Sequence, residues 1–502
     1  MSHPDGGALA GSAAIPEALN LDEYGTYIGG KWREGRGEPL RVDSPSTGQA
    51  LMSLTCSSVS DADEAIQAAH NAQPGWSRLS IPERGRRLLM FADALDAHAE
   101  QLAVLLALEV GKPIAQGRGE LEFAIGTLRY QAGWAYRLLG EIVPSDRPGE
   151  SIHLLRVPVG VVIAICAWNF PMAMFCRKVA PALLAGNAVV LKASELTPLS
   201  AMALTHLGEE ASIPPGVLNL VTGGREIGKA LVEHRGADMV TMTGSISSGK
   251  AVMAQAAPHL AKVSLELGGK APAIVWSDAD LDVTVPAIVT ARHTNSGQVC
   301  TSAERVYVHE EVIDQFLNRY TAAVRQLRVG NPFDRVDMGP LASRAQKEKV
   351  ESAVAEALQG GAEEVARGEV DSGVAAGGFW TSPTVVLDPP PACRLMREEV
   401  FGPVTPVVPV STTAEFLCAA NDSDYGLSGY VFSNDYAFIT EVIKELQCGE
   451  IYINRTLGEA IQGHHSGHKQ SGVGGEDGLH GLLRYTQIRT VYHNAVARID
   501  SL

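Results

Sequence analysis

A series of short apolar runs between residues 161 and 269 constrains the fold more than any other feature of this chain. The runs are VVIAICAW (161–168), NAVVLKA (187–193), GVLNLVTG (216–223), DMVTMTG (238–244) and AKVSLELGG (261–269), and they begin 26, 29, 22 and 23 residues apart. Helix-compatible segments separate them, which is the spacing of βαβ units. Because the runs are continuously apolar, they predict a parallel sheet covered on both faces. We therefore expect a doubly wound nucleotide-binding domain.

The segments on either side of this region predict different structures. YIGGKW (27–32) has the glycine pair of a tight hairpin, and residues 60–140 have a helical pattern. Beyond Pro272 we expect a second α/β region that opens with a helix at about 279–296 and includes strands at 305–312, 400–410 and 429–433. IRTVYHNAVARI (488–499) alternates like an exposed edge strand, and pairing with another subunit would protect it.

Composition and charge exclude several classes of protein. At 502 residues the chain is long enough for two to four domains. A net charge of −16 argues against nucleic acid or an anionic membrane as the main partner. The uncharged stretch from Val157 to Cys176 is long enough to span a membrane, but its prolines and glycine favour a strand, a turn and a helix start.

The cysteines and the first residues bear on location. Seven cysteines are scattered with no C-x-x-C pair, which fits free thiols in a reducing, cytoplasmic setting. Residues 1–23 lack the basic and apolar regions of a secretory signal, and we expect them to form a flexible tail.

Three polar side chains stand at positions suited to acyl chemistry. Cys300, in NSGQVCTS, lies in a polar loop after a predicted helix, although a cysteine is more often a small buried hydrophobe. Glu266 ends a predicted parallel strand, where open α/β sheets place their ligand sites. Asn169, in AWNFP, also follows a predicted strand and opens a helix, so its amide can face an oxyanion. Together they supply a nucleophile, a base and an oxyanion donor.

The nucleotide signal departs from the usual glycine fingerprint. The predicted strands are followed by GGREIG (223–228) and GSISSG (244–249), and neither matches G-x-G-x-x-G. Lys192 and Glu195 end the NAVVLKASE strand, where a carboxylate can hold ribose hydroxyls. The alternative is a solvated ion pair at a helix start.

Six ordered motifs resemble the aldehyde dehydrogenase superfamily: AWNFP, KASE, TGS, ELGGK, GQVC and EEVFGPV. The resemblance extends from YIGGKW to the terminal strand. It implies that Cys300 is the nucleophile, Glu266 the general base and Asn169 the oxyanion donor. It also implies an NAD(P) site, for which we expect contacts from Cys166, Trp168, Lys192, Glu195, Gly224, Gly228, Ser245, Glu399 and Phe401.

The same resemblance implies a domain division and an assembly. We expect an NAD-binding domain at 24–140 and 161–271, a catalytic domain at 272–470 and a β-strand oligomerisation arm at 141–160 and 483–502. The superfamily usually assembles as homodimers or homotetramers. We expect NAD rather than NADP, because Glu195 would repel a 2′-phosphate and no arginine lies in the KASE turn.

Further motifs resemble the lactaldehyde and glycolaldehyde dehydrogenase branch: GEIVPSDRPGE (140–150), GEIYINR (449–455) and EAIQGHH (459–465). In that branch, residues matching Arg177, Glu459 and His465 contact a small hydroxylated substrate, and Thr301 stands where the branch has asparagine. Two alternatives for Arg177 are a helix-surface charge and a pair with an internal carboxylate such as Glu459. An anion-bearing semialdehyde and a broad-range or aromatic aldehyde are the alternative substrates.

Other activities fit the sequence less well. A non-catalytic member would typically lack the nucleophile or base, and a cysteine amidohydrolase would leave the nucleotide domain unexplained. Transfer of the acyl group to coenzyme A is opposed by Glu266, which serves an attack by water. The histidines of HHSGH (464–468) could bind zinc weakly, but no helical pair or cysteine supports a site, and we predict no metal.

Overall fold

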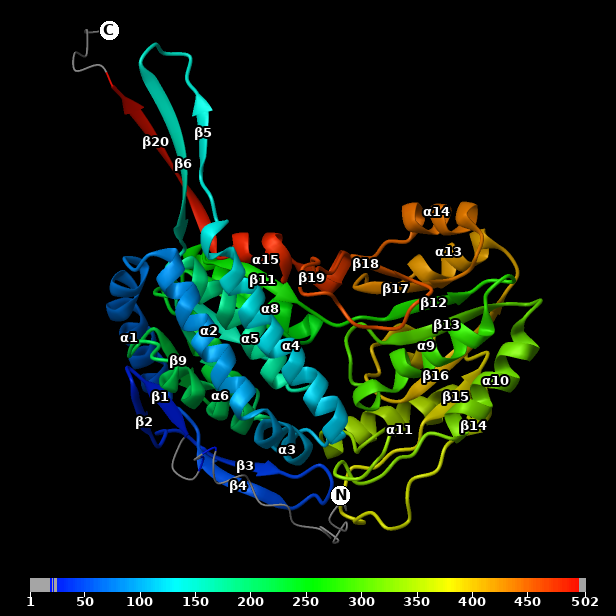
Figure 1. Cartoon of the computed structure of the whole chain (residues 1–502). Helices are drawn as coiled ribbons and strands as arrows, with labels where there is room; N and C mark the ends of the chain where they lie inside the picture. Colours follow the sequence, from blue (N-terminus) through cyan, green and yellow to red (C-terminus); the bar gives the residue numbers. More distant parts are fainter. Residues whose placement is uncertain (1–18, 20, 22–24, 496–502) are drawn as a thin grey trace, which may run out of the picture.

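A computed structural model describes Leu19, Leu21 and residues 25–495 of the chain. The tail predicted at 1–23 therefore lies outside the described residues, apart from those two leucines. Figure 1 shows two lobes side by side, with a narrow three-stranded extension that projects from one of them. Among the described helices, none has the length and hydrophobicity needed to cross a membrane.

The first lobe is built on an eight-stranded sheet. Its strands are β1 (Thr26–Ile28), β2 (Lys31–Arg33), β7 (Val161–Ile165), β8 (Ala188–Lys192), β9 (Leu218–Val221), β10 (Met239–Thr243), β11 (Lys262–Glu266) and β19 (Gly472–Val473). Their order in the sheet is β19-β11-β10-β7-β8-β9-β1-β2. The five central strands, β7 to β11, pair in parallel, as the apolar runs predict. The predicted hairpin is confirmed, since β1 pairs antiparallel with β2.

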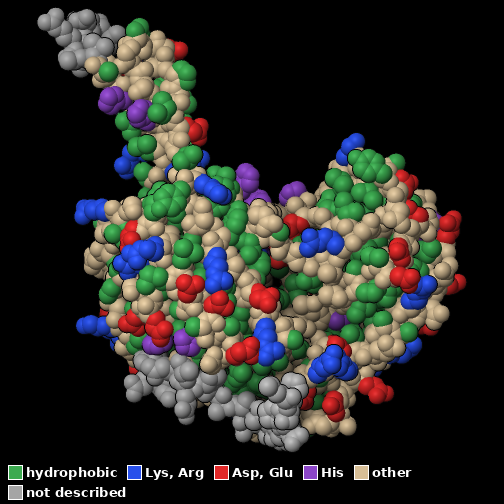
Figure 2. All heavy atoms as spheres, in the orientation of Figure 1, with side chains coloured by type: hydrophobic (Ala, Val, Ile, Leu, Met, Phe, Trp, Pro, Cys, Tyr) green, Lys and Arg blue, Asp and Glu red, His purple; other side chains and the backbone are tan. Residues whose placement is uncertain are grey.

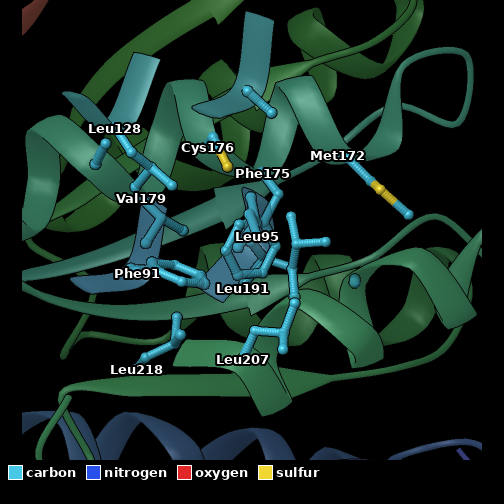
Figure 3. Packing of buried hydrophobic residues seen from close by; sticks show 14 of the residues in the cluster. Phe91, Leu95, Leu128, Met172, Phe175, Cys176, Val179, Leu191, Leu207 and Leu218 are labelled. Atoms are coloured by element: carbon cyan, nitrogen blue, oxygen red, sulfur yellow. The ribbon is translucent and has the colours of Figure 1, made fainter. Parts of the chain in front are cut away.

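Helices cover both faces of this sheet. They are α1 (Val59–Ser77), α2 (Ile81–Ala97), α3 (Ala99–Glu109), α4 (Ile114–Ala132), α5 (Pro171–Ala185), α6 (Pro198–Glu210), α7 (Arg225–Glu233), α8 (Ile246–Ala256) and α15 (Gly478–Arg484). One core joins α2 to α6 with the sheet, and a second joins α1, α7 and α8 with its other face. Figure 3 shows the first core, where Phe91 and Phe175 pack between helices and against Leu191 of β8. Burial on both faces explains why most residues of the central strands are apolar.

The second lobe contains a seven-stranded sheet in the order β14-β15-β16-β13-β12-β17-β18. The strands are β12 (Ala271–Val275), β13 (Ala303–His309), β14 (Glu363–Arg367), β15 (Thr384–Leu387), β16 (Val404–Val410), β17 (Ser428–Phe432) and β18 (Glu450–Ile453). Its helices are α9 (Leu281–His293), α10 (Ile313–Arg325), α11 (Arg344–Gln359), α12 (Arg394–Arg397), α13 (Thr413–Asn421) and α14 (Tyr436–Glu445). Separate cores lie on the two faces, one with α9 and α10 and one with α11 to α14.

Strand β12 differs from the sequence prediction, which begins this region with a helix. The strand lies inside the sheet between β13 and β17, although it contains Pro272. The pairing of β12 with β13 shifts register between Ala271 and Pro272, so the missing N–H of proline falls at an irregularity in the ladder.

The extension is a three-stranded antiparallel sheet of β5 (Glu141–Pro144), β6 (Glu150–Pro158) and β20 (Thr486–Asn494), which we call the arm. Strand β6 lies in the middle, so β5 and β20 form its two edges. Figure 2 shows hydrophobic side chains on the surface of the arm, and Ile142, Ile488 and Tyr492 are 74%, 55% and 67% exposed. Near the start of the chain, β3 (Pro39–Asp43) and β4 (Ala50–Thr55) form a separate antiparallel pair of strands.

Candidate active site

The loop that carries Cys300 is shaped by an unusual turn after α9. Asn295, Ser296 and Gly297 all have left-handed backbones, with φ of +49°, +57° and +75°. A side chain at Gly297 would meet the Gly402 carbonyl oxygen at 2.4 Å, so only glycine fits there. Asparagine tolerates this conformation better than most residues, whereas serine is strained. The turn reverses the chain and brings Cys300 to the junction of the two lobes, just before β13.

Cys300 lines a cavity of about 820 Å³. The wall of this cavity also contains Asn169 and all nine residues predicted to contact the cofactor. Of the predicted substrate residues, Arg177, Thr301 and Glu459 line it as well. One continuous space therefore joins the thiol to the predicted dinucleotide site. Burial raises the pKa of the Cys300 thiol, and a hydrogen bond to His465 opposes that rise.

Asn169 is held firmly in the loop between β7 and α5. Its backbone oxygen accepts hydrogen bonds from Lys112 Nζ and Asn295 Nδ2, each at 3.0 Å. Its side-chain Nδ2 donates to the Gln298 backbone oxygen at 3.0 Å. An amide nitrogen has two hydrogens, so one remains for a ligand in the cavity.

A buried ion pair supports this loop. Lys112 and Glu120 are both fully buried and hydrogen-bonded to each other. Glu120 also accepts hydrogen bonds from the backbone N–H groups of Met172 and Ala173, at 2.9 and 3.1 Å. These are in the first turn of α5, where N–H groups have no partner within the helix. The pair thereby fixes both sides of Asn169.

Glu266 is the last residue of β11 and is buried next to the site. Neither of its carboxylate oxygens has a hydrogen-bond partner among the described residues. Burial raises the pKa of Glu266 to about 8, although nearby His465, whose Nε2 lies 3.7 Å from Oε2, acts to lower it. A carboxyl group with so high a pKa is partly protonated near neutral pH, and its ionised form is a strong enough base to take a proton from water.

The far end of the cavity has the features of a dinucleotide site. Helices α7 and α8 both begin at its wall, with Gly224 and Ser245 as their N-caps. Free N–H groups and the helix dipole favour phosphate at such ends. Lys192 Nζ lies 3.4 Å from Glu195 Oε2, and the Glu195 side chain is 51% exposed, so its carboxylate is open to a ribose. This donor set fits a dinucleotide.

Near Cys300, an aromatic pair and a carboxylate complete the predicted cofactor set. The rings of Trp168 and Phe401 meet edge to face, with centroids 5.4 Å apart. Buried Glu304 accepts hydrogen bonds from the N–H groups of Val400 and Phe401, which holds the latter at its left-handed φ of +59°. Glu399 Oε1 accepts from the Gly269 N–H at 2.8 Å.

Arg177 lies on α5 and is 3% exposed, so the prediction of a helix-surface charge is wrong. Its Nη2 is 2.8 Å from Asp477 Oδ2 and 3.6 Å from Glu459 Oε2. The alternative of an internal ion pair is confirmed, with Asp477 as the nearer partner. Thr301 Oγ1 donates to Glu459 Oε1 at 3.4 Å. Arg177 Nε has no hydrogen-bond partner among the described residues, so a buried donor remains for a polar ligand.

His465 occupies a different place from the other predicted substrate residues. It is 2% exposed and, like Glu266, is not among the described residues that line the cavity. It contacts Cys300, Glu266 and Glu450 instead. The neighbouring His464 turns to the backbone oxygen of Glu476, so these two histidines of HHSGH have separate partners.

Several supporting residues were missed by the sequence interpretation: Lys112, Glu120, Asn295, Glu450 and Asp477. Three of them lie in conspicuous motifs, since Asn295 begins NSGQVCTS, Glu450 belongs to GEIYINR and Asp477 to the glycine-rich GGEDG (474–478). The Asp477 backbone has a φ of +61°, and such strain at a non-glycine residue often marks a functional site. A charged residue among glycines is the signal that could have pointed to it.

Fold and site together define a class of enzyme. A cysteine, a hydrogen-bond donor for an oxyanion and a basic carboxylate lie at a cavity between two α/β lobes whose wall also contains the predicted cofactor residues. These groups are suited to nucleotide-dependent chemistry on a carbonyl group held covalently by a thiol.

Comparison with known proteins gives the family. The aldehyde dehydrogenase family matches residues 32–491. Lactaldehyde dehydrogenase of Escherichia coli (strain K12) is 43% identical over 94% of this chain and 98% of its own. The mitochondrial succinate-semialdehyde dehydrogenase of Arabidopsis thaliana is 40% identical over 92% of this chain and 88% of its own. A solved structure of 3,6-anhydro-L-galactose dehydrogenase in complex with NAP is 40% identical, with a TM-score of 0.92, and the match covers 94% of this chain and all of that one. The chain belongs to the aldehyde dehydrogenase family.

Proposed function

We propose that this aldehyde dehydrogenase oxidises short α-hydroxyaldehydes, such as lactaldehyde or glycolaldehyde, to the acids with NAD. The observation that carries the proposal is the state of Arg177. Its positive charge is already met by Asp477 and Glu459, so Arg177 offers the substrate a polar group but no surplus charge. A neutral substrate with a hydroxyl group suits such a pocket better than an anion does.

The chain's own residues account for each chemical stage. Cys300 Sγ attacks the aldehyde carbon, and the second Nδ2 hydrogen of Asn169 stabilises the oxyanion of the thiohemiacetal, together with the Cys300 backbone N–H. NAD, held by the predicted cofactor residues that line the cavity, among them Lys192, Glu195 and Glu399, would supply the hydride acceptor. Glu266 then takes a proton from water, which attacks the thioester and releases the acid. Because Glu266 supplies a base for water, hydrolysis is favoured over transfer to coenzyme A.

The hydroxyl next to the carbonyl would meet Arg177, Glu459 and Thr301. Burial acts to raise the pKa of Glu459, but the positive charges of His465 and Arg177 outweigh it, so the pKa is lowered. The carboxylate is therefore ionised and accepts a hydrogen bond from a substrate hydroxyl. An alkyl or aryl aldehyde would leave these groups unpaired, at about 1–3 kcal/mol each.

The main alternative is a semialdehyde that carries a carboxylate or a sulfonate. Relatives named for both lactaldehyde and succinate semialdehyde are about equally similar to this chain. Paired Arg177 favours the hydroxyaldehyde. A broad-range or aromatic specificity would require a pocket without the buried polar groups at Arg177 and Glu459.

A panel of aldehydes tests the substrate class. We expect kcat/KM, followed by NADH absorbance at 340 nm, to be highest for lactaldehyde and glycolaldehyde. Succinic semialdehyde and benzaldehyde should be at least about tenfold poorer, the cost of one unpaired polar group. A preference for benzaldehyde, or for succinic semialdehyde, would refute the hydroxyaldehyde assignment.

Other features of the enzyme are proposed on separate grounds. We assign cofactor binding to 24–140 and 161–271, and catalysis to 272–470. NAD is preferred because exposed Glu195 would repel a 2′-phosphate. Seven free cysteines support a cytoplasmic location.

The arm supports a homodimer or homotetramer. Its edge strands β5 and β20 carry exposed apolar side chains, which pairing with a second copy would cover. Light scattering of the wild type and of an Ile488→Asp variant tests this assignment. We expect an oligomer that the substitution dissociates, and a monomeric wild type would contradict it.

A further inference from the structure

His465 lies between the nucleophile and the base of the site. The neighbouring Cys300 side chain raises the pKa of its imidazole, and its Nε2 is 3.7 Å from Glu266 Oε2. Glu266 itself has no hydrogen-bond partner among the described residues, Cys300 included. The thiol and the carboxylate are thus linked through the imidazole ring.

The ring is held so that one nitrogen faces this pair. His465 Nδ1 lies 3.2 Å from Glu450 Oε1, within hydrogen-bonding distance. Glu450 is fixed in turn by Tyr452, whose hydroxyl donates to Oε2 at 2.9 Å. Since Nδ1 is taken by Glu450, Nε2 is the nitrogen left for Cys300 and Glu266. A nucleophile, an imidazole and an orienting carboxylate in this order form the arrangement of a catalytic triad.

We propose that His465 relays the proton of Cys300 to Glu266 and so generates the attacking thiolate. In this step the imidazolium gives the proton on Nε2 to a Glu266 carboxylate oxygen. The freed Nε2 lone pair then takes the proton from Sγ. The products are a Cys300 thiolate, the restored imidazolium and a protonated Glu266, so charge and protons balance. Glu266 releases this proton to solvent before it takes a second one from the water that attacks the thioester.

The charges around His465 set the protonation state from which this transfer begins. Burial alone would lower the pKa of His465, but hydrogen bonds to Cys300 and Glu450 and the charge of Glu266 raise it well above the usual range. The ring therefore begins as an imidazolium, and Glu266, with its raised pKa, is basic enough to accept a proton from it. The titratable groups that act on His465, or on its partners Cys300 and Glu266, are Glu399, Glu450, Glu459, Glu476, Asp477, Arg177 and Lys178.

The distance of 3.7 Å from Nε2 to Oε2 is longer than a hydrogen bond. Catalytic hydrogen bonds are often long in the unliganded enzyme and shorten in the reacting complex. A small movement of the Glu266 carboxylate, which no hydrogen bond restrains, closes the gap. His465 does not line the cavity, so it is better placed to relay a proton than to contact the substrate.

The proposal rests on the thiol chemistry of the proposed function but not on the identity of the aldehyde. We therefore test it without substrate, by alkylation of full-length enzyme with iodoacetamide between pH 5.5 and 10. Peptide mass spectrometry follows Cys300 separately from the other thiols. The aldehyde panel tests the substrate class, and the alkylation test concerns only the ionisation of Cys300. Either test can fail while the other succeeds, so the two failures are distinguishable.

In a His465→Asn variant we expect the alkylation profile of Cys300 to move to higher pH by about one unit, with a rate about tenfold lower at pH 7. Glu266→Gln should move it in the same direction. The double variant should move it no further, because both residues act in one path. Coincident profiles for wild type and His465→Asn would overturn the proposal, and so would full additivity in the double variant.

Two further variants make the result specific. His464→Asn changes the adjacent histidine, which contacts the Glu476 backbone, and should leave the Cys300 profile unchanged. Glu450→Gln keeps the imidazole but removes the charge that orients it, so a smaller shift to higher pH is expected. If His465→Asn does not fold, as judged by its melting temperature, Glu450→Gln decides the question, and an unshifted profile there overturns the relay.

Discussion

Replacing Asp477 with asparagine should change which aldehydes the enzyme accepts. Asp477 Oδ2 lies 2.8 Å from Arg177 Nη2, and both side chains are almost wholly buried. Asp477→Asn removes the charge, keeps the shape and suits the left-handed backbone at this position. Arg177 then has a positive charge to offer, and an anionic substrate becomes more acceptable.

The size of the effect follows from the geometry. A substrate carboxylate on the open side of the Arg177 guanidinium would lie about 6 Å from Asp477. At an effective dielectric of about 20, repulsion at that distance is about 3 kcal/mol, and water in the cavity reduces it to about 1.5–2 kcal/mol. We therefore expect kcat/KM for succinic semialdehyde, relative to glycolaldehyde, to rise roughly ten- to thirtyfold.

The same reasoning predicts a pH dependence in the wild type. Burial raises the pKa of Asp477 to about 6, although Arg177 acts to lower it. Below about pH 6 Asp477 is protonated and loses its charge, whereas the carboxylate of succinic semialdehyde is still mostly ionised at pH 5.5. The relative kcat/KM for the semialdehyde should therefore rise as pH falls through 6. In Asp477→Asn this rise should be absent.

Steady-state NADH kinetics on both substrates at pH 5.5 and 7.5 measure these ratios. Asp422→Asn is the matched control, because Asp422 forms a 2.8 Å pair with Arg397 on the surface. The control should leave the ratio unchanged. An unchanged ratio in Asp477→Asn would refute the claim that Arg177 is neutralised by its protein partners.

Three other predictions test separate parts of the site. Asn169→Ala should slow turnover by hundreds-fold, about 3–4 kcal/mol of barrier, and a variant as fast as wild type would remove Asn169 from the mechanism. Glu195→Ser should narrow the preference for NAD in kcat/KM measurements, and a wild type that favours NADP would contradict the role given to Glu195. Lys112→Met should lower the free energy of unfolding by about 3–5 kcal/mol in urea titrations, because it leaves Glu120 buried and unpaired. Removing both charges, with Lys112→Met and Glu120→Leu together, should lower the free energy of unfolding by less than Lys112→Met alone. An equal loss of stability would show that the unpaired Glu120 carboxylate is not its cause.

Local sequence patterns predicted the parts of the fold that depend on local burial. The five central strands of the first sheet are mostly apolar because helices cover both faces, and this pattern is visible without a structure. Strand β12 was missed because Pro272 is normally evidence against an interior strand. The register shift beside Pro272, which accommodates it, depends on β13 and has no local signal.

For the candidate site too, sequence patterns predicted some residues and not others. Glu266 and Asn169 lie at the carboxyl ends of predicted parallel strands, so topology brings them near one edge of the sheet. Cys300 follows a predicted helix, and the left-handed turn at 295–297 brings it to the same place. The partners that set their chemistry come from distant segments. Asp477 neutralises Arg177 from the far end of the chain, and Glu450 orients His465 from a strand of the other lobe. Pairings of this kind arise from tertiary packing, which single-sequence patterns do not contain.

The central claim is that Cys300 forms a covalent acyl intermediate that Glu266 helps water to hydrolyse. Rapid-mixing measurement of NADH in Glu266→Gln, with glycolaldehyde and NAD, tests it most directly. The account predicts a burst of about one NADH per active site, followed by a nearly stalled phase with an acyl group on Cys300 detectable by mass spectrometry. A steady rate equal to that of the wild type, with no adduct on Cys300, would contradict it.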